Sequence, residues 1–384
     1  MKITCRFLFS LILSVFLTAV SLGDSPAAAK KFLVFVGTYT DKTDSKGIYA
    51  YEFDTTTGKL TLRGLAAETP NPSWVVIHPN GKFLYAANES GKQSTISAFS
   101  IDAKAAKLTL LNQLPALGED PCYLSLDKTG KYLFVANYTS GNVVVFPLLP
   151  DGTLGPAAAN VKDVGTPGPN KERQDGPHAH WVESSPDNRF VLVADLGLDA
   201  ILSYRFNSTK GTLIPNDPPF ARLAPGAGPR HALFSFNGKL VHVVSELNST
   251  VTTLSYDPQN GSLSEPQVVS TLPKDFHGRN DDAEIALHPS GMGLYASNRG
   301  HDSIAVFRGA GVQGAMTPVG IFPTGGKEPR HFAVDPTGWF VLAENQYSNS
   351  IVVLRVNLPT GDLREVSSTE NVPSPVCLVF LRQP

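Results

Sequence analysis

One short pattern returns seven times along this chain of 384 residues, and the repetition limits the possible folds more than any other feature. Each copy is a run of strand-forming residues that ends in a small or polar residue, and the copies lie about 50 residues apart. The aligned end positions are Gly37, Asn88, Asn137, Asp195, Ser245, Asn298 and Asn345. A repeat of this length indicates stacked units, none of which can bury its apolar face alone.

A second marker gives the same number of units. A short turn of the form Gly-x-Leu, or a close variant, follows each end position and begins at Gly58, Ala106, Gly152, Gly211, Gly261, Gly314 and Gly361. Because the two markers agree and run through the whole chain, we expect one domain that covers residues 30–384.

Each unit is predicted to contain four strands. In the second unit, turn residues separate strand-like segments at residues 73–78, 82–88, 94–102 and 107–114. The 33 Gly, the 30 Pro and the charged fraction of 17% are typical of short strands joined by turns. The sequence therefore predicts an all-β fold, a seven-bladed β-propeller of four-stranded antiparallel blades around a channel.

The two ends of the repeat region are complementary. The first unit begins with a second-strand motif at residues 32–38, and the chain finishes with a lone first-strand motif at residues 376–381. We expect this C-terminal strand to close the first blade, because an unpaired strand edge would invite aggregation.

The first residues form a separate segment. Lys2 and Arg6 precede an apolar stretch at residues 7–22, and small residues lie just before Asp24. This is typical of a secretory signal peptide, residues 1–23, and it predicts an exported protein, periplasmic or extracellular. An uncleaved membrane anchor is the alternative, although about 20 apolar residues are needed to span a bilayer.

Charge and cysteines restrict the partners. Loss of Lys2 and Arg6 would take the formal charge from −2 to −4, so no basic excess remains for nucleic acid or for a membrane surface after cleavage. Cys122 and Cys377 fall in non-adjacent units, and we expect two buried thiols rather than a disulfide. Trp74, Trp181 and Trp339 lie within strand motifs and are predicted to be core residues.

The repeat register places several ionisable residues at one end of the ring. The start of each first strand and the end of each second strand share one face of a propeller. At these positions lie His180, Arg230, Arg330, Glu89, Glu246 and Arg299. Singly, each can be a solvated loop residue or half of an ion pair between blades. Together, in a chain with so few charges, they predict a site at one mouth of the channel.

The residue types suggest acid–base chemistry. Arginines bind carboxylate or phosphate and can stabilise an oxyanion, which predicts a small anionic substrate. Glu246 beside arginines would stay ionised and could act as a base, and His180 would titrate near neutrality and could deliver a proton. His178 and His180 form a conceivable metal pair, but no third ligand is fixed nearby in the sequence, so we expect no metal.

Two irregular segments reach the same face. An insertion at residues 165–176, rich in Gly, Pro and charge, precedes His178 and is either a lid or an exposed spacer. The connection at residues 275–282 contributes His277, Arg279 and aspartates.

Short sequence motifs within the repeats resemble those of a known family. The motifs are Val36-Gly37-Thr38-Tyr39-Thr40, Asn71-Pro72-Ser73, Ala136-Asn137-Tyr138, Pro177-His178-Ala179-His180, Val193-Ala194-Asp195-Leu196-Gly197 and Gly228-Pro229-Arg230-His231. They resemble the seven-bladed propeller lactonase family, which includes bacterial 6-phosphogluconolactonases and fungal 3-carboxy-cis,cis-muconate lactonizing enzymes. The resemblance implies a catalytic set of His180, Arg230, Glu246 and Arg299 that needs no cofactor. We expect His178, Arg330 and Glu89 to bind the substrate.

Several functions fit this sequence. The leading hypothesis is hydrolysis of an acidic or phosphorylated sugar lactone, in which Glu246 activates water, Arg230 and Arg299 hold the anion and the oxyanion, and His180 protonates the leaving alkoxide. The same residues could instead lactonize a muconate-type diacid. A secreted binding scaffold without activity and a metal-dependent gluconolactonase are the remaining alternatives.

Overall fold

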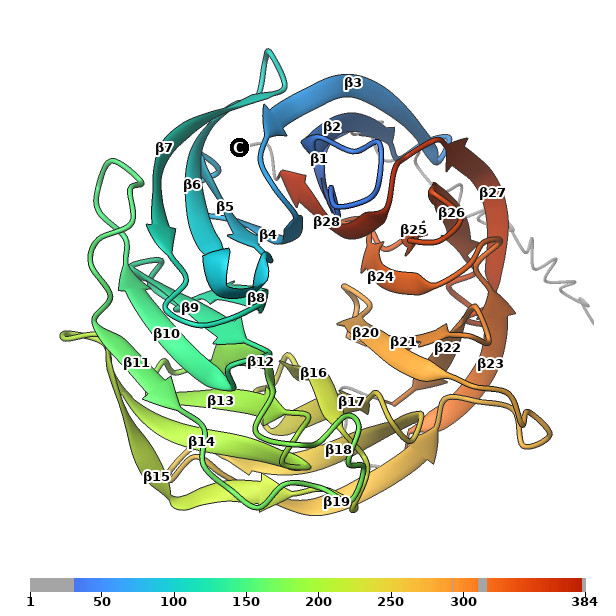
Figure 1. Cartoon of the computed structure of the whole chain (residues 1–384). Helices are drawn as coiled ribbons and strands as arrows, with labels where there is room; N and C mark the ends of the chain where they lie inside the picture. The colour runs from blue at the N-terminus through green and yellow to red at the C-terminus, as the bar shows by residue number, and fades with distance from the viewer. Residues whose placement is uncertain (1–30, 292, 310–315, 382–384) are drawn as a thin grey trace, which may run out of the picture.

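The strands form seven four-stranded antiparallel sheets that are arranged in a ring (Figure 1). The computed structural model describes residues 31–291, 293–309 and 316–381. Within these ranges the only helical element is a 3-10 turn, η1 (Gly91–Gln93). The predicted all-β, seven-bladed propeller is therefore confirmed. The predicted signal peptide lies outside the described residues.

We number the blades in chain order. Blade 1 holds β28 (Pro375–Leu381), β1 (Lys31–Thr38), β2 (Gly47–Asp54) and β3 (Lys59–Glu68), and blade 2 holds β4 (Pro72–Ile77), β5 (Phe83–Asn88), β6 (Thr95–Asp102) and β7 (Lys107–Pro115). Blade 3 holds β8 (Pro121–Leu126), β9 (Tyr132–Asn137), β10 (Asn142–Pro147) and β11 (Ala159–Lys162), and blade 4 holds β12 (Ala179–Ser184), β13 (Phe190–Asp195), β14 (Ala200–Asn207) and β15 (Thr212–Arg222). Blade 5 holds β16 (Pro229–Phe234), β17 (Leu240–Ser245), β18 (Thr250–Asp257) and β19 (Ser262–Ser270). Blade 6 holds β20 (Asp281–Leu287), β21 (Gly293–Arg299), β22 (Ser303–Arg308) and β23 (Thr317–Pro323), and blade 7 holds β24 (Pro329–Val334), β25 (Phe340–Asn345), β26 (Ser350–Val356) and β27 (Leu363–Glu370).

The first strand of every blade lies nearest the centre of the ring, and the fourth strand forms the rim (Figure 1). The second strands are the most completely buried: β9, β13, β17 and β25 have no residue that is even partly exposed. These strands carry near-continuous apolar runs because neighbouring blades cover both of their faces.

The C-terminal strand closes the ring as predicted. β28 pairs antiparallel with β1, with Val34 opposite Phe380 and Val36 opposite Leu378. Across the junction with blade 7, the rings of Phe53 and Phe340 meet edge to face at 5.6 Å. This contact buries the seam between the first and last blades of the sequence.

The predictions for individual residues had mixed outcomes. The four strands of blade 2 begin and end within one residue of the predicted ranges. Cys122 and Cys377 are buried free thiols, as expected. Trp181 is fully buried and Trp74 is half-buried, but the prediction for Trp339 was wrong. Trp339 lies in the turn before β25, is 39% exposed, and lies against the guanidinium of Arg355.

Candidate functional site

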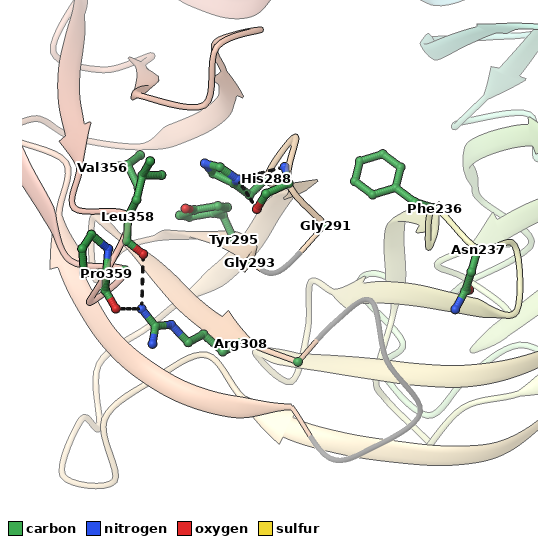
Figure 2. Close-up of a pocket in the computed structure, with 13 residues that line it drawn as sticks. Phe236, Asn237, His288, Gly291, Gly293, Tyr295, Arg308, Val356, Leu358 and Pro359 are labelled. Atoms are coloured by element: carbon green, nitrogen blue, oxygen red, sulfur yellow. Dashed lines mark hydrogen bonds between the residues drawn. The ribbon is translucent and has the colours of Figure 1, made fainter. Parts of the chain in front are cut away.

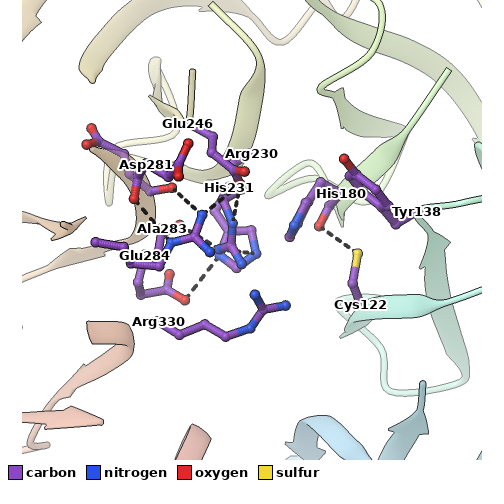
Figure 3. Close-up of polar contacts among 12 residues, drawn as sticks. Cys122, Tyr138, His180, Arg230, His231, Glu246, Asp281, Ala283, Glu284 and Arg330 are labelled. Carbon is purple, nitrogen blue, oxygen red and sulfur yellow. Dashed lines mark hydrogen bonds and ion pairs between the residues drawn. The ribbon is translucent and has the colours of Figure 1, made fainter. Parts of the chain in front are cut away.

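A polar hollow of about 370 Å³ lies at one mouth of the channel, where first strands begin and second strands end. Its lining is Tyr39, Glu89, Cys122, Tyr138, Arg173, His180, Glu246, Arg279, Asp281, Arg299, Glu328, Arg330 and Tyr347. Of the seven predicted site residues, His180, Glu246, Arg299, Arg330 and Glu89 line this hollow. Arg230 and His178 are not among its lining residues, and the guanidinium of Arg230 lies next to the carboxylate of Glu246 (Figure 3).

A repeated β-bulge explains why the first strands contribute their side chains to this hollow. The pairing of first and second strands shifts by one residue between Pro121 and Tyr123, between Ala179 and Trp181, and between Pro329 and His331. The residues inside these shifts are Cys122, His180 and Arg330. A bulge re-aims one side chain at the end of a ladder, and these three bulges direct Cys122, His180 and Arg330 into the hollow.

Glu246 is the electrostatic centre of the site. It follows β17, and its carboxylate contacts three guanidinium groups. Arg230 Nε lies 2.9 Å and Arg299 Nη2 lies 3.0 Å from Oε2, while Arg173 contacts Oε1. Burial alone would raise the pKa of Glu246, but the three arginines lower it far below its ordinary value. The carboxylate is therefore ionised at neutral pH, and because arginines engage both of its oxygens it is poorly placed to accept a proton.

Arg230 is buried beneath the hollow and does not line it. The residue is 2% exposed, and its Nη1 donates to the carbonyl of Ala283 at 2.7 Å. Burial and the charges of Arg299 and Arg330 lower the pKa of Arg230 to about 10, so it remains a cation at neutral pH. The guanidinium contacts Glu246 and does not line the hollow, and the expected contact of Arg230 with substrate stays a prediction.

His180 differs electrostatically from the prediction. The residue is 5% exposed, and no hydrogen-bond partner of its Nδ1 occurs among the described residues. Burial lowers the pKa of His180 well below its ordinary value, and the charges of Arg230 and Arg330 lower it further. The prediction that His180 titrates near neutrality was wrong, because burial beside two cations disfavours the imidazolium. His180 is a neutral imidazole that can accept a proton.

A chain of hydrogen bonds connects Arg330 to Glu89 through Tyr39, which was not among the predicted site residues. Arg330 Nη2 donates to the hydroxyl of Tyr39 at 2.9 Å, and this hydroxyl donates to Glu89 Oε2 at 2.8 Å. Thr38 pairs with Pro375 just as Asn88 pairs with Pro72, so Thr38, not Gly37, is the true end position of blade 1. The alignment was therefore one residue out of register in blade 1, and this shift hid Tyr39.

The insertion at residues 165–176 delivers Arg173 to the mouth. Gln174 is fully buried, and its amide donates to the carbonyl of Leu196 at 2.8 Å and to Asp199 at 2.7 Å. A Cβ at Gly197 would lie 1.8 Å from the carbonyl oxygen of Gly176, so only glycine allows the insertion to pass this closely. Held in this way, the segment places Nη2 of Arg173 where it donates to Glu246 and lies 3.3 Å from the Tyr138 hydroxyl.

His178 does not reach the hollow. Its Nδ1 contacts the carbonyl of Tyr138 at 3.0 Å, its Nε2 contacts Asp175 at 2.8 Å, and its ring stacks on Tyr138. Both ring nitrogens are thus engaged away from His180. The expected substrate contact is not supported, and His178 instead supports the side chain of Tyr138.

A second hollow in the described part of the chain has fewer side chains that could react with or bind a polar substrate. This larger hollow, about 780 Å³, lies at the opposite ends of the first strands and has a mainly apolar lining (Figure 2). Its histidine and its arginine are engaged within the protein: His288 contacts the carbonyl of Gly338 at 2.8 Å, and Arg308 donates to the carbonyl of Pro359. Across residues 31–291, 293–309 and 316–381, no cluster of three or more His, Cys, Asp or Glu residues could hold a metal ion. In the same ranges no helix has the length and hydropathy to cross a bilayer.

Comparisons with known proteins agree with this architecture. A family model described as "Lactonase, 7-bladed beta-propeller" matches residues 33–380. A 6-phosphogluconolactonase of Bacillus subtilis is 38% identical over 92% of this chain and 99% of its own length, and one of Formosa agariphila is 35% identical over 87% and 95%. The solved structure of a periplasmic gluconolactonase of Pseudomonas aeruginosa superposes with a TM-score of 0.86 at 32% identity, covering 92% of this chain and all of that one.

Proposed function

We propose that this chain, which belongs to the family of seven-bladed β-propeller lactonases, hydrolyses the ester bond of a small sugar lactone at the channel mouth. The observation that supports this most strongly is the arrangement of three arginines around one buried carboxylate, next to a neutral histidine in a polar hollow. Relatives named 6-phosphogluconolactonase match almost the entire chain and provide the substrate class.

His180 is the general base in this proposal. Its neutral imidazole would accept a proton from a water molecule while the water oxygen attacks the lactone carbonyl carbon. The ring C–O bond then breaks, and the same imidazole returns the proton to the leaving alkoxide. The balance is one lactone and one water converted to one hydroxy acid. This reverses the order expected from the sequence, in which Glu246 was the base and His180 the acid.

Arg299, Arg173 and Arg330 supply positive charge at the hollow. The carbonyl oxygen becomes an oxyanion during the attack, and a guanidinium already fixed in place stabilises that charge without reorganisation. Arg299 is the best fixed of the three, because its Nε donates to the carbonyl of Asp281 at 3.1 Å and its Nη2 reaches Glu246. Glu246 therefore acts as the anchor of the arginines and not as a proton acceptor.

The charges of the lining favour a substrate with a small net charge. Four arginines, Arg173, Arg279, Arg299 and Arg330, face four carboxylates, Glu89, Glu246, Asp281 and Glu328. Beneath them, Arg230 supplies one further positive charge. Carboxylates at the rim can accept hydrogen bonds from sugar hydroxyls, and the arginines can bind one carboxylate or phosphate.

A substrate panel tests this proposal. The purified protein is mixed with gluconolactone, with its 6-phosphate and with a simple unsubstituted lactone, and acid release is followed at constant pH. We expect turnover of at least one sugar lactone above the spontaneous rate and little turnover of the unsubstituted ring. No acceleration with any of the three would contradict the proposed function.

We further propose that the protein acts outside the cytoplasm. Two observations support export: the signal-like segment at residues 1–23 and the likeness to a periplasmic gluconolactonase. Cell fractionation with an antibody against the mature domain tests this, and recovery of the chain only with cytoplasmic markers would contradict it.

A further inference from the structure

A second cluster of titratable side chains is buried inside the ring, below the channel mouth. It consists of His231 on β16, Glu284 on β20, His331 on β24 and Glu344 on β25, each at most 6% exposed. None of these residues lines the hollow, so none is placed to touch a substrate. The edge-to-face contacts of Trp74 with His231 at 5.2 Å and with His331 at 5.3 Å pack the space between the two imidazoles.

The contacts of His231 determine which ring nitrogen carries its proton. Its Nε2 lies 3.2 Å from Nη1 of Arg230, and a guanidinium can only donate. Nε2 must therefore be the nitrogen with the free lone pair, which places the proton on Nδ1. Nδ1 lies 3.1 Å from Oε2 of Glu284, so the Glu284 carboxylate accepts a hydrogen bond from this Nδ1–H (Figure 3). Burial and the charge of Arg230 lower the pKa of His231 well below its ordinary value, consistent with a neutral ring.

Glu284 is itself firmly held. Its Oε1 accepts the backbone N–H of Ile285 at 2.8 Å, and its own N–H donates to the Ser297 hydroxyl at 3.0 Å. Its backbone neighbour Ala283 provides the carbonyl that accepts from Arg230. Glu284 is thus connected to Arg230 in two ways, through the adjacent Ala283 carbonyl on β20 and through the imidazole of His231.

We propose that Glu284 is a positioning residue, whose carboxylate fixes the Nδ1–H tautomer of His231 and thereby orients Arg230 toward Glu246 and His180. The proposal rests on the proposed function, because Arg230 matters for catalysis only if the hollow above it is the reaction site. The relay runs from Glu284 to His231, to Arg230 and then to Glu246, so it connects the channel interior to the arginine cluster.

The relay predicts a dependence on pH. Burial raises the pKa of Glu284 to about 6, against the lowering effects of His331 and Arg230. The charged and titratable groups that face Glu284 are Arg230 and His231 from β16, His331 from β24, Glu344 from β25, Tyr123 from β8 and Cys377 from β28. A protonated Glu284 would donate to Nδ1 of His231 and leave the imidazole proton on Nε2, where it would oppose an N–H of Arg230.

Two measurements test the inference. The first is nitrogen-15 NMR of protein labelled at its histidines, in which a His231→Asn variant identifies the signals of His231. We expect His231 to be the Nδ1–H tautomer at pH 7.5 and to change to the Nε2–H tautomer near pH 6. In kinetics, we expect the wild-type kcat/KM to fall below this pH, whereas Glu284→Gln should lose the dependence, with kcat about tenfold lower and KM little changed. Glu183→Gln, on the first strand β12 and paired with Lys128, is the matched control and should keep the wild-type profile.

The outcomes separate the two proposals. An Nε2–H tautomer of His231 at neutral pH, or a Glu284→Gln profile identical to the wild type, would overturn the positioning role. The tautomer measurement needs neither activity nor a folded Glu284 variant. A wild-type protein without lactonase activity but with the Nδ1–H tautomer would therefore overturn the proposed function alone.

Discussion

The Arg230 guanidinium and the Glu246 carboxylate lie 2.9 Å apart beneath the channel mouth, and their side chains are 2% and 5% exposed. Arg230→Ala would leave Glu246 with only Arg173 and Arg299, would remove the donor from the Ala283 carbonyl, and would leave the buried volume of the guanidinium unfilled. We therefore expect Arg230→Ala to lower the free energy of unfolding by about 3–5 kcal/mol. Chemical denaturation at neutral pH checks this, and a loss below about 1 kcal/mol, typical of an exposed ion pair, would contradict the described burial.

The stabilising effect of Glu246 should depend on acidity. Because the pKa of Glu246 in the folded state lies below the unfolded value of 4.5, its contribution is fully present above pH 4.5 and is lost as pH falls toward the folded value. We expect the difference in unfolding free energy between the wild type and Glu246→Gln to shrink steadily below pH 4.5. Denaturation curves at pH 7, 5, 4 and 3 measure it, and a constant difference would argue against the lowered pKa.

Arg173 should contribute mainly to substrate binding. Its side chain is 34% exposed and belongs to a loop, so Arg173→Ala should cost little stability but remove one cation from the mouth. We expect KM to rise about tenfold, the cost of one charge-assisted hydrogen bond, with a smaller change in kcat. Arg189→Ala is the matched control, because Arg189 pairs with Asp187 in the turn at the opposite end of β12. Equal kinetics of the two variants would contradict a role for Arg173.

Tyr39 should matter through its hydroxyl. Tyr39→Phe keeps the ring, which lies under the guanidinium of Arg330, but removes the hydrogen bonds to Arg330 and Glu89. We expect kcat/KM to fall about tenfold, because Arg330 and Glu89 lose the hydroxyl that connects them, and the melting temperature to fall by a few degrees, because each bond to a charged group stabilises the fold by roughly 1.5–3 kcal/mol. Steady-state kinetics with thermal melts measure both, and unchanged kcat/KM would show that Arg330 is positioned without the tyrosine.

Much of the fold was predictable from the sequence because the repeat is encoded locally in every blade. Each unit carries its own turn residues and its own apolar second strand, so seven agreeing copies outweigh any single ambiguous segment. Closure followed from the complementary motifs at the two ends, which the pairing of Val36 with Leu378 confirms. The prediction that Trp339 is a core residue failed because its segment was assigned to a strand, whereas the residue lies in the turn just before β25.

The site was less predictable where it departs from the repeat. His180, Arg230, Glu246 and Arg299 occupy equivalent positions, so register alone brought them together. Arg173 belongs to an insertion with no counterpart in other blades, and nothing in its sequence indicates that buried Gln174 would fix its path. The proton-transfer roles could not be read from residue types, because they depend on burial and on cations from several blades.

The most direct test of the account is the rate of sugar-lactone hydrolysis by the wild type, by Glu246→Gln and by the control Arg189→Ala, followed as acid release at constant pH. Loss of the anchor for three arginines removes preorganised charge from the oxyanion, so we expect kcat/KM of Glu246→Gln to fall by about 10²–10³ while Arg189→Ala stays at the wild-type value. Circular dichroism confirms that each variant is folded. Wild-type rates in a folded Glu246→Gln protein would contradict the claim that this carboxylate and its arginines form the active site.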